Sequence, residues 1–339
     1  MGDTPGSYLT NYDAVCACLR ELRTGQVREI GRSPGGRALL AVSYGEFEPI
    51  ERRANFSAAL SAGAPEAFYG PGRKKPALVI SAAVHGAEME SIAAVMHLIS
   101  LLETGRDRDG REWPALLGAL EQMRLVAVPV ANPDARARIP SDDALAWADD
   151  EMEQYRHGLG PDGEPIGWMP GCFAPHPKDP AAQVFLGGYF NDAGVNPSHG
   201  ALLERDISPE AHALADLALE ETADCFLDLH SCGAGPFFIL GSSFIPADLA
   251  ARQSHFDGAW RARMRERGLP APDWSTRSQR QVMGLGDYVY HKAGSLPLLF
   301  EGGDGHRYSG GDVHRQIAET YLLLFETVCE IAVAEGLKG

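Results

Sequence analysis

The sequence lacks the signatures of membrane-spanning, secreted and disulfide-stabilised proteins. It has no run of about 18 apolar residues, the length at which a transmembrane helix becomes a candidate. The segment Met1–Ser7 has no basic stretch followed by an apolar core, the pattern of a secretory signal. Six cysteines are scattered over the 339 residues and form no Cys-x2-Cys pair, so we expect neither a disulfide scaffold nor a structural zinc site. We therefore expect a cytoplasmic location.

Positive charge is also scarce, since 30 Lys and Arg stand against 46 Asp and Glu and give a formal net charge of −16. Nucleic acids and anionic membrane surfaces repel such a chain, so we expect neither as a partner. A hydrophobic share of 45% can build a large core. We expect one domain over residues 1–339, with an irregular insertion at about 141–190 that is first acidic and then rich in Pro and Gly. The oligomeric state is left open.

Four residues carry the strongest functional signal: His85 and Glu88 in His-x-x-Glu, His230 in Asp-Leu-His-Ser, and Glu301 in Leu-Phe-Glu-Gly. Catalytic zinc takes three protein ligands and leaves a fourth position for water. His85, Glu88 and His230 would supply that set. Zinc lowers the pKa of its bound water to about 7. A carboxylate that binds no metal, for which Glu301 is the candidate, can take the water's proton and pass it to the leaving amine.

The sequence around these four residues indicates that they lie close together in the folded chain. Three apolar runs have the pattern of buried parallel strands, and they are residues 77–84, 225–229 and 296–300, which precede His85, His230 and Glu301. The apolar spacing after Glu88 predicts an amphipathic helix to about residue 103. In open α/β sheets, ligand sites lie outside the carboxyl ends of parallel strands, so three distant segments can meet there.

The remaining patterns alternate between helix and strand, as in an α/β protein. Helices are predicted at 10–24, 208–221 and 311–335, and strands at 27–30, 38–44 and 124–130. The strands 27–30 and 38–44 flank a turn rich in Gly and Pro, so we expect a hairpin that begins the sheet.

The ordered set of motifs resembles the zinc carboxypeptidases, the carboxypeptidase A-like metallopeptidases. The matching segments are 28–37, 84–88, 132–134, 228–231 and 300–301, within a resemblance that spans roughly residues 8–335. It implies an α/β fold with a mixed, twisted central sheet of about eight strands between helices, a phosphorylase/hydrolase-like architecture. It also implies one Zn²⁺ per chain on His85, Glu88 and His230, Glu301 as general base, and a peptide or small amide as substrate.

The groups that contact substrate in this family are less well matched. The family places an arginine that polarises the scissile carbonyl about a dozen residues after the Asn-Pro-Asp turn, but residues 139–155 contain none. Arg136 and Arg138 lie nearer the turn, and Arg156 lies beyond that stretch. The tyrosine that closes over substrate is also missing, because residues 275–286 contain no tyrosine.

The segment 189–196 lacks the Asn-Arg pair with which the family holds the substrate's terminal carboxylate. Asn191 could be the family's asparagine, which would put Asp192 in place of the arginine. Alternatively, Asp192 orients His85 through its other ring nitrogen. We favour the second interpretation, because a metal-bound histidine nearly always has such a partner. In either alignment the usual carboxylate clamp is broken.

An anionic substrate group would need another partner, and the planar fork of arginine is suited to a carboxylate. We predict that at least one of four arginines binds substrate, the candidates being Arg136, Arg138, Arg277 and Arg280. Arg156 and Arg307 are further possibilities.

Three function classes stay open at this point. The leading one is a carboxypeptidase-type metallopeptidase. The alternative is a deacylase similar to aspartoacylase or succinylglutamate desuccinylase, acting on small N-acyl amino acids. That branch usually has an Asp-Leu-Asn-Arg segment, which is absent here, and the family-like segment 31–37 favours the peptidase. A catalytically silent binding protein would need loss of a ligand or of the base, and all four residues are present.

Overall fold

The computed structural model describes residues 5–70, 74–168, 171–172, 177–272, 276–277, 283–304, 308 and 312–337. Within these residues, eight strands form one sheet in the order β1-β2-β4-β3-β5-β8-β6-β7. They are β1 (Gln26–Arg32), β2 (Ala38–Tyr44), β3 (Ala77–Ala82), β4 (Arg124–Val128), β5 (Cys225–Cys232), β6 (Phe237–Leu240), β7 (Thr276–Arg277) and β8 (Leu296–Gly303). The predicted mixed sheet of about eight strands is confirmed.

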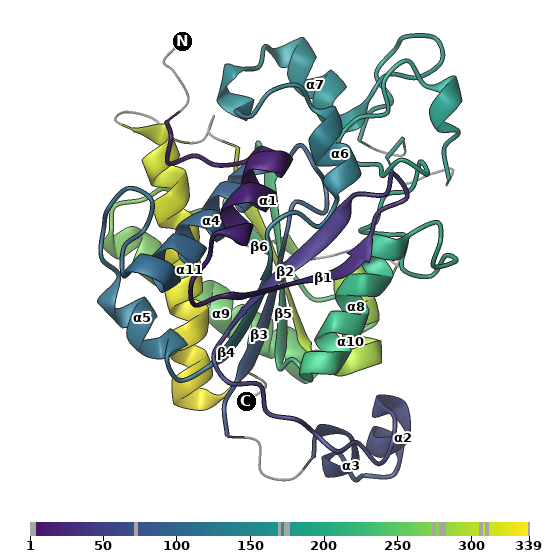
Figure 1. Ribbon diagram of the computed structural model, residues 1–339. Helices are drawn as coiled ribbons and strands as arrows, with labels where there is room; N and C mark the ends of the chain where they lie inside the picture. Colours follow the sequence, from purple (N-terminus) through teal and green to yellow (C-terminus); the bar gives the residue numbers. More distant parts are fainter. Residues whose placement is uncertain are drawn as a thin grey trace.

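Helices cover both faces of the sheet (Figure 1). They are α1 (Tyr12–Arg20), α2 (Phe56–Ser61), α3 (Glu66–Tyr69), α4 (Met89–Thr104), α5 (Pro114–Leu120), α6 (Pro133–Arg138), α7 (Asp149–His157), α8 (Pro209–Glu221), α9 (Ala247–Glu266), α10 (Leu285–Ala293) and α11 (Val313–Glu335). Helices α4, α5, α9 and α11 pack on one face, and α8 and α10 on the other. No helix of the described part is both long and apolar enough to cross a membrane.

The sheet is mixed because its centre and its edges differ. Strands β4, β3, β5 and β8 run parallel, whereas the β1–β2 hairpin and β6 are antiparallel to their neighbours towards the centre. All six residues of β3 are buried, as expected for a central parallel strand covered on both faces. The hairpin predicted from the sequence is confirmed as β1 and β2.

Alternate residues of β5 face opposite sides of the sheet. Leu227 and Leu229 pack in the same core cluster as apolar side chains of α4, α9 and α11. Asp228 and His230 therefore point to the other face, where Phe226 packs with α8 and α10. Asp228 and His230 thus project from one face of a strand whose other face packs in the apolar core.

The turn of the β1–β2 hairpin docks on the Asn-Pro-Asp segment. The Asp134 carboxylate accepts hydrogen bonds from Ser33 Oγ at 2.6 Å, Gly35 N at 2.9 Å and Arg37 Nη1 at 2.8 Å. Asp134 itself is 1% exposed. Two of the segments that carry the family resemblance therefore contact each other and support the loops at the carboxyl ends of the strands.

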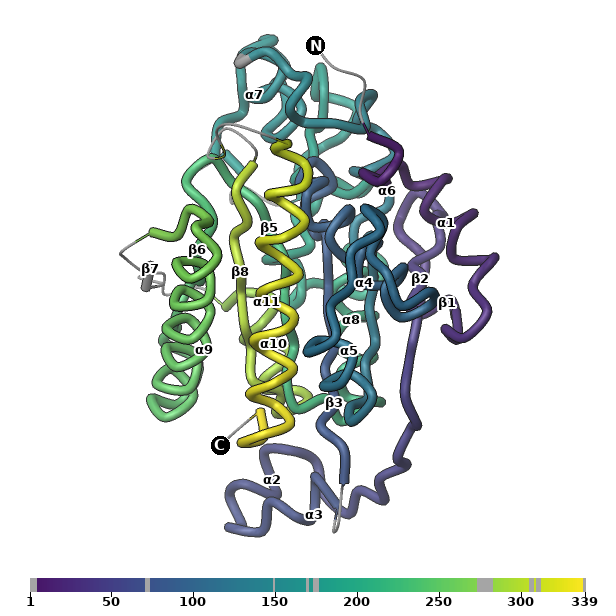
Figure 2. The backbone as a smooth tube through the Cα atoms, turned by 90° about the vertical axis from the view of Figure 1, so that its left-hand side faces the viewer, coloured from purple at the N-terminus to yellow at the C-terminus, as the bar shows by residue number. Residues whose placement is uncertain are grey.

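The described part of the segment 141–190 lies above the sheet, where it carries α7 and two short 3-10 turns (Figure 1). Gly188 O accepts from Gly86 N at 2.8 Å, and Gly188 N donates to Tyr155 O at 2.7 Å. The segment therefore contacts the loop between His85 and Glu88. At the opposite end of the molecule, α2 and α3 form a small projection near the C-terminus (Figure 2).

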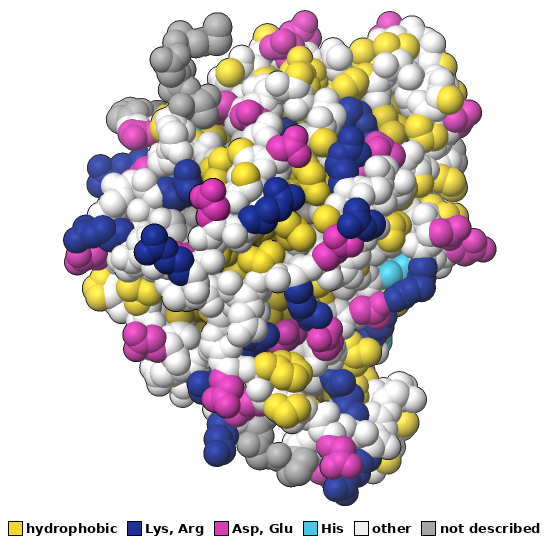
Figure 3. Space-filling view, in the orientation of Figure 1, with side chains coloured by type: hydrophobic (Ala, Val, Ile, Leu, Met, Phe, Trp, Pro, Cys, Tyr) yellow, Lys and Arg dark blue, Asp and Glu magenta, His cyan; other side chains and the backbone are white. Residues whose placement is uncertain are grey.

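The acidic excess of the sequence is not gathered into one patch on the face shown in Figure 3. Lys and Arg side chains intermingle there with Asp and Glu side chains and with small apolar areas.

Candidate metal centre

A strained turn carries the chain from β3 to α4. Ala83 has a φ of 52°, in the left-handed region that residues with a Cβ rarely adopt. Its N–H donates to Ser91 Oγ at 3.1 Å, and the Ser91 hydroxyl donates to Glu88 O at 2.7 Å. A Cβ on Gly86 would lie 2.2 Å from the backbone nitrogen of Arg136. The turn is therefore locked between α4 and α6, with His85 and Glu88 directed inward.

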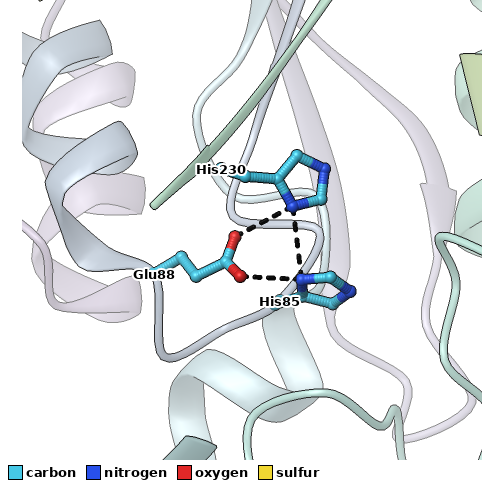
Figure 4. A group of neighbouring side chains, drawn as sticks. All are labelled: His85, Glu88 and His230. Carbon is cyan, nitrogen blue, oxygen red and sulfur yellow. Dashed lines mark hydrogen bonds and ion pairs between the residues drawn. The ribbon is translucent and has the colours of Figure 1, made fainter. Parts of the chain in front are cut away.

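The side chains of His85, Glu88 and His230 converge on one point (Figure 4). His85 Nδ1 lies 2.8 Å from Glu88 Oε1, His230 Nδ1 lies 3.0 Å from Glu88 Oε2, and the two Nδ1 atoms lie 3.3 Å apart. All three residues are buried. The structure thus brings together the three ligands predicted from the sequence.

The outer nitrogens show which ring atoms carry protons. His85 Nε2 lies 3.1 Å from Asn196 Oδ1, and His230 Nε2 lies 3.1 Å from Asp228 Oδ2. Both partners are acceptors, so both Nε2 atoms donate. In the neutral imidazoles, both Nδ1 atoms then present lone pairs towards the Glu88 carboxylate. Three electron-rich groups facing one another favour a shared cation.

The dimensions of this cluster fit zinc. With Zn–N bonds of ~2.0–2.1 Å in a tetrahedron, two ligand nitrogens lie ~3.3–3.4 Å apart. The observed separation of the Nδ1 atoms of His85 and His230 is 3.3 Å. Two imidazoles and one carboxylate are also a ligand set of catalytic zinc, which leaves a fourth position for water. The residues present therefore fit the metal that the resemblance implies.

In the absence of a metal, the neighbouring charges set the protonation states of His230 and Glu88. Burial opposes the charged form of His230, but Asp228 and Glu88 outweigh it and raise the pKa of His230 well above its ordinary value. Burial likewise disfavours ionised Glu88, but His85 and His230 lower the pKa of its carboxyl far below the usual range. Glu88 is thus an anion in the folded protein, ready to bind a cation.

Glu301, the predicted general base, lies beside this cluster. It pairs with His230 in the register of β5 and β8, and among the described residues it is not one of the converging ligands. Burial raises the pKa of Glu301, and the Glu88 charge adds to this, while the charges of His230 and His85 and a hydrogen bond with Cys232 oppose it. A raised pKa brings a carboxylate nearer to the pKa that proton transfer requires.

The predicted role of Asp192 is corrected by the structure. Asp192 does not orient His85, because its carboxylate pairs with Arg138 at 2.6 Å and Arg37 at 3.1 Å. Asn196 takes that place, with its Oδ1 also accepting from Ser198 N at 3.0 Å. The prediction took a carboxylate as the partner of His85, whereas the acceptor is an amide oxygen. The only sequence signal for Asn196 is its place at the end of the segment 189–196.

Asn191 has a role within the fold. Its Oδ1 accepts from the backbone N–H groups of Ala193 and Val195, both at 3.1 Å, and its Nδ2 donates to Glu210 Oε2 at 3.0 Å. The side chain is fully buried. These contacts favour a turn-forming role over the predicted contact with substrate.

The four arginine candidates lie in different settings. Arg136 is 1% exposed and donates to Thr10 O, Ile139 O, Ser141 O and Asp142 Oδ1. Arg138 donates to Gly187 O, Phe190 O and Asp192 Oδ1. These bonds occupy both guanidinium groups with partners inside the protein. The side chain of Arg277 and the whole of Arg280 lie outside the described residues, as does Arg307.

Arg156, at the end of α7, is the arginine that the structure brings to the metal centre. It pairs with Asp304 Oδ2 at 3.3 Å, while its Nε has no hydrogen-bond partner within the described chain. Burial opposes its charge, but the carboxylates of Glu90, Asp304 and Glu88 raise the pKa of Arg156. The charged, acidic sequence of α7 gives no sign that one of its cations turns inward.

No protein-family model matches the sequence, and no curated protein sequence matches it. The fold, however, matches solved structures. A metallo-carboxypeptidase from Burkholderia cenocepacia is 19% identical with a TM-score of 0.56, over 95% of this chain and 68% of the other. A metallo-carboxypeptidase from Pseudomonas aeruginosa was solved in complex with (2-guanidinoethylmercapto)succinic acid. It is 15% identical with a TM-score of 0.59, over 95% of this chain and 68% of the other.

The carboxypeptidase A of Helicoverpa armigera is 14% identical with a TM-score of 0.54, over 96% of this chain and 71% of the other. The chain therefore has the metallo-carboxypeptidase fold, as the sequence resemblance implied.

Proposed function

We propose that the protein is a zinc-dependent hydrolase of amide bonds, a metallopeptidase of the carboxypeptidase type. One observation carries the proposal: the Nδ1 atoms of His85 and His230 lie 2.8 and 3.0 Å from the Glu88 carboxylate and 3.3 Å from each other, and Glu301 is the strand partner of His230. This is a ligand set with an open position and a base that is not a ligand. The fold shared with metallo-carboxypeptidases supports the same chemistry.

Zinc bound by His85, Glu88 and His230 would polarise the substrate carbonyl and acidify water. Glu301 takes one proton from the attacking water as the oxygen of that water bonds to the carbonyl carbon. The C–N bond then breaks with its electron pair on nitrogen, and Glu301 returns the proton to that nitrogen. The products are a carboxylic acid and an amine, and the carboxylate of Glu301 is restored.

Arg156 is placed to assist this step. As the carbonyl carbon becomes tetrahedral, its oxygen gains negative charge, and a fixed cation stabilises that charge in a water-poor site. The Arg156 guanidinium is held by Asp304 near the metal ligand Glu88. We assign to it the interaction with this oxygen or with a carboxylate of the substrate.

The substrate would be a peptide or a small amide. The described part of the segment 141–190 contacts the loop of His85 and Glu88 through Gly188, which favours short substrates. The test panel contains blocked dipeptides, γ-glutamyl peptides and N-acyl amino acids, together with a peptide ending in arginine, because the Pseudomonas carboxypeptidase was solved with a guanidino compound. Hydrolysis confined to N-acyl amino acids would instead assign the deacylase chemistry.

The metal is tested separately from the substrate. Purified wild-type protein should contain about one zinc per chain, and His85→Ala, Glu88→Ala and His230→Ala should lose most of it while keeping the fold. His255→Ala, which changes an exposed histidine of α9, is the matched control and should keep its zinc. Near-stoichiometric zinc in His85→Ala would overturn the assignment.

A further inference from the structure

Tyr189 lies against the metal centre, in the stretch of chain that follows the Pro- and Gly-rich insertion. Its ring stacks on the imidazole of His85 with a centroid distance of 4.0 Å and an interplanar angle of 26°. Its backbone nitrogen donates to Arg156 O at 3.2 Å, and the preceding Gly188 bonds to Gly86. The ring is therefore fixed between α7 and the loop that carries two metal ligands, and it is only 9% exposed.

The Tyr189 hydroxyl makes no hydrogen bond within the described part of the chain. Two other buried tyrosines do form such bonds: Tyr321 Oη donates to His230 O at 2.7 Å, and Tyr308 Oη donates to Thr320 Oγ1 at 3.1 Å. The ordinary pKa of a tyrosine hydroxyl is about 10, so near neutral pH this hydroxyl keeps its proton and can donate it to a hydrogen bond.

The surroundings show which substrate atom this donor would meet. Glu301 stands on the His230 side of the centre, as its partner in the β5–β8 register, and the leaving nitrogen must lie near it. The Tyr189 ring stacks on His85, and its backbone N–H bonds to the backbone of Arg156. Arg156 is the cation assigned above to the carbonyl oxygen, so we take this oxygen, which becomes negative as the carbon turns tetrahedral, as the substrate atom nearest to Tyr189.

We infer that Tyr189 is a catalytic residue whose hydroxyl donates a hydrogen bond to the substrate oxygen that becomes negative. This inference rests on the proposed hydrolase function. No covalent bond to tyrosine is made or broken, and the hydroxyl keeps its proton throughout. The aromatic ring has a separate role, since stacking holds His85 in the orientation that presents Nδ1 to the metal.

The two roles are separated by two substitutions. Tyr189→Phe keeps the ring and removes the hydroxyl, so kcat/KM should fall ~10- to 150-fold, the range for a hydrogen bond to a charged group, mostly in kcat. Its zinc affinity should equal that of the wild type. Tyr189→Leu also removes the stacked ring and should in addition weaken zinc binding. Tyr155→Phe, which removes a hydroxyl on α7, is the matched control and should keep wild-type values.

A second measurement does not depend on turnover. Acetohydroxamate, an anionic zinc ligand, is titrated into zinc-loaded wild type and Tyr189→Phe by calorimetry, with ~10-fold or greater weakening expected in the variant. If the wild type hydrolyses the panel but neither kcat/KM nor hydroxamate binding changes in Tyr189→Phe, the inference is overturned and the proposed function stands. If the wild type hydrolyses nothing but the variant loses hydroxamate affinity, the donor role stands and the proposed function fails. A wild type that neither hydrolyses the panel nor binds acetohydroxamate overturns both.

Discussion

His230 and Glu301 are direct partners in the register of the parallel strands β5 and β8. Paired residues of neighbouring strands point to the same face of a sheet. A candidate metal ligand and the candidate base are therefore held side by side by the backbone, and Phe237 of β6 pairs with Glu301 on its other side. Such a rigid support fixes the distance over which a proton must move.

Glu301→Gln should separate the base from the ligands. Glutamine keeps the size and a hydrogen-bonding oxygen but cannot accept the water's proton, so kcat should fall at least ~10²-fold. Zinc content, measured by atomic emission, should stay at the wild-type level, because Glu301 is not one of the three converging ligands. Loss of zinc from this variant would make Glu301 a ligand instead.

Asn196 should set the affinity for zinc through His85. Its Oδ1 accepts from the Nε2–H of His85, so that Nδ1 faces Glu88 and the candidate metal position. Asn196→Leu removes that acceptor and should weaken zinc binding ~10- to 100-fold in a chelator competition assay, whereas Asn196→Asp keeps an acceptor and should lose less. Asp192→Asn is the control, because the structure pairs Asp192 with arginines. Equal zinc affinities in wild type and Asn196→Leu would refute this role.

Much of the site can be predicted from the sequence because strands deliver its residues. Apolar runs and the motifs after them are enough to locate His85, Glu88, His230 and Glu301. The residues around them depend on loop conformation, which no periodicity encodes. The Asn191 amide closes a turn with Val195, so that Asp192 faces the arginines.

Helices and strands without a periodic apolar pattern cannot be predicted from the sequence either. Helix α7 consists almost wholly of charged and polar residues, yet it brings Arg156 to the metal centre. Strand β7 has only two residues, too few for any pattern to show. Tyr189 stands in a stretch of glycines, and its stacking on His85 depends on long-range packing.

Arginine substitutions should distinguish a substrate contact from structural contacts. Arg156→Gln should lower kcat/KM ~10- to 150-fold, the range expected for a lost charge-assisted bond. Arg136→Ala should instead lower the free energy of unfolding, because the buried guanidinium bonds several backbone carbonyls. The measurements are kcat/KM and urea unfolding for both variants. Unchanged kcat/KM in Arg156→Gln would return the role to Arg277 or Arg280.

Glu210 should make the stability of the fold depend on pH. Its carboxyl is fully buried, and Asn191 Nδ2 donates to one oxygen at 3.0 Å. Burial raises the pKa of Glu210 to about 8, opposed by the Asn191 hydrogen bond and assisted by the charges of Asp134 and Asp192. In the unfolded chain the pKa of Glu is about 4.3. The folded protein therefore holds this proton more tightly than the unfolded chain does.

The direction of the effect follows from that difference. The stabilisation from Glu210 is fully present below about pH 4 and is lost as the pH rises towards about 8, with a slope of up to ~1.4 kcal/mol per pH unit. Glu210→Gln cannot ionise, so its free energy of unfolding, measured in urea at pH 5, 6.5 and 8, should decline less than that of the wild type. Glu220→Gln, an exposed site on the same helix, should decline as the wild type does. Parallel declines in all three proteins would show that Glu210 is ionised in the folded state at pH 5.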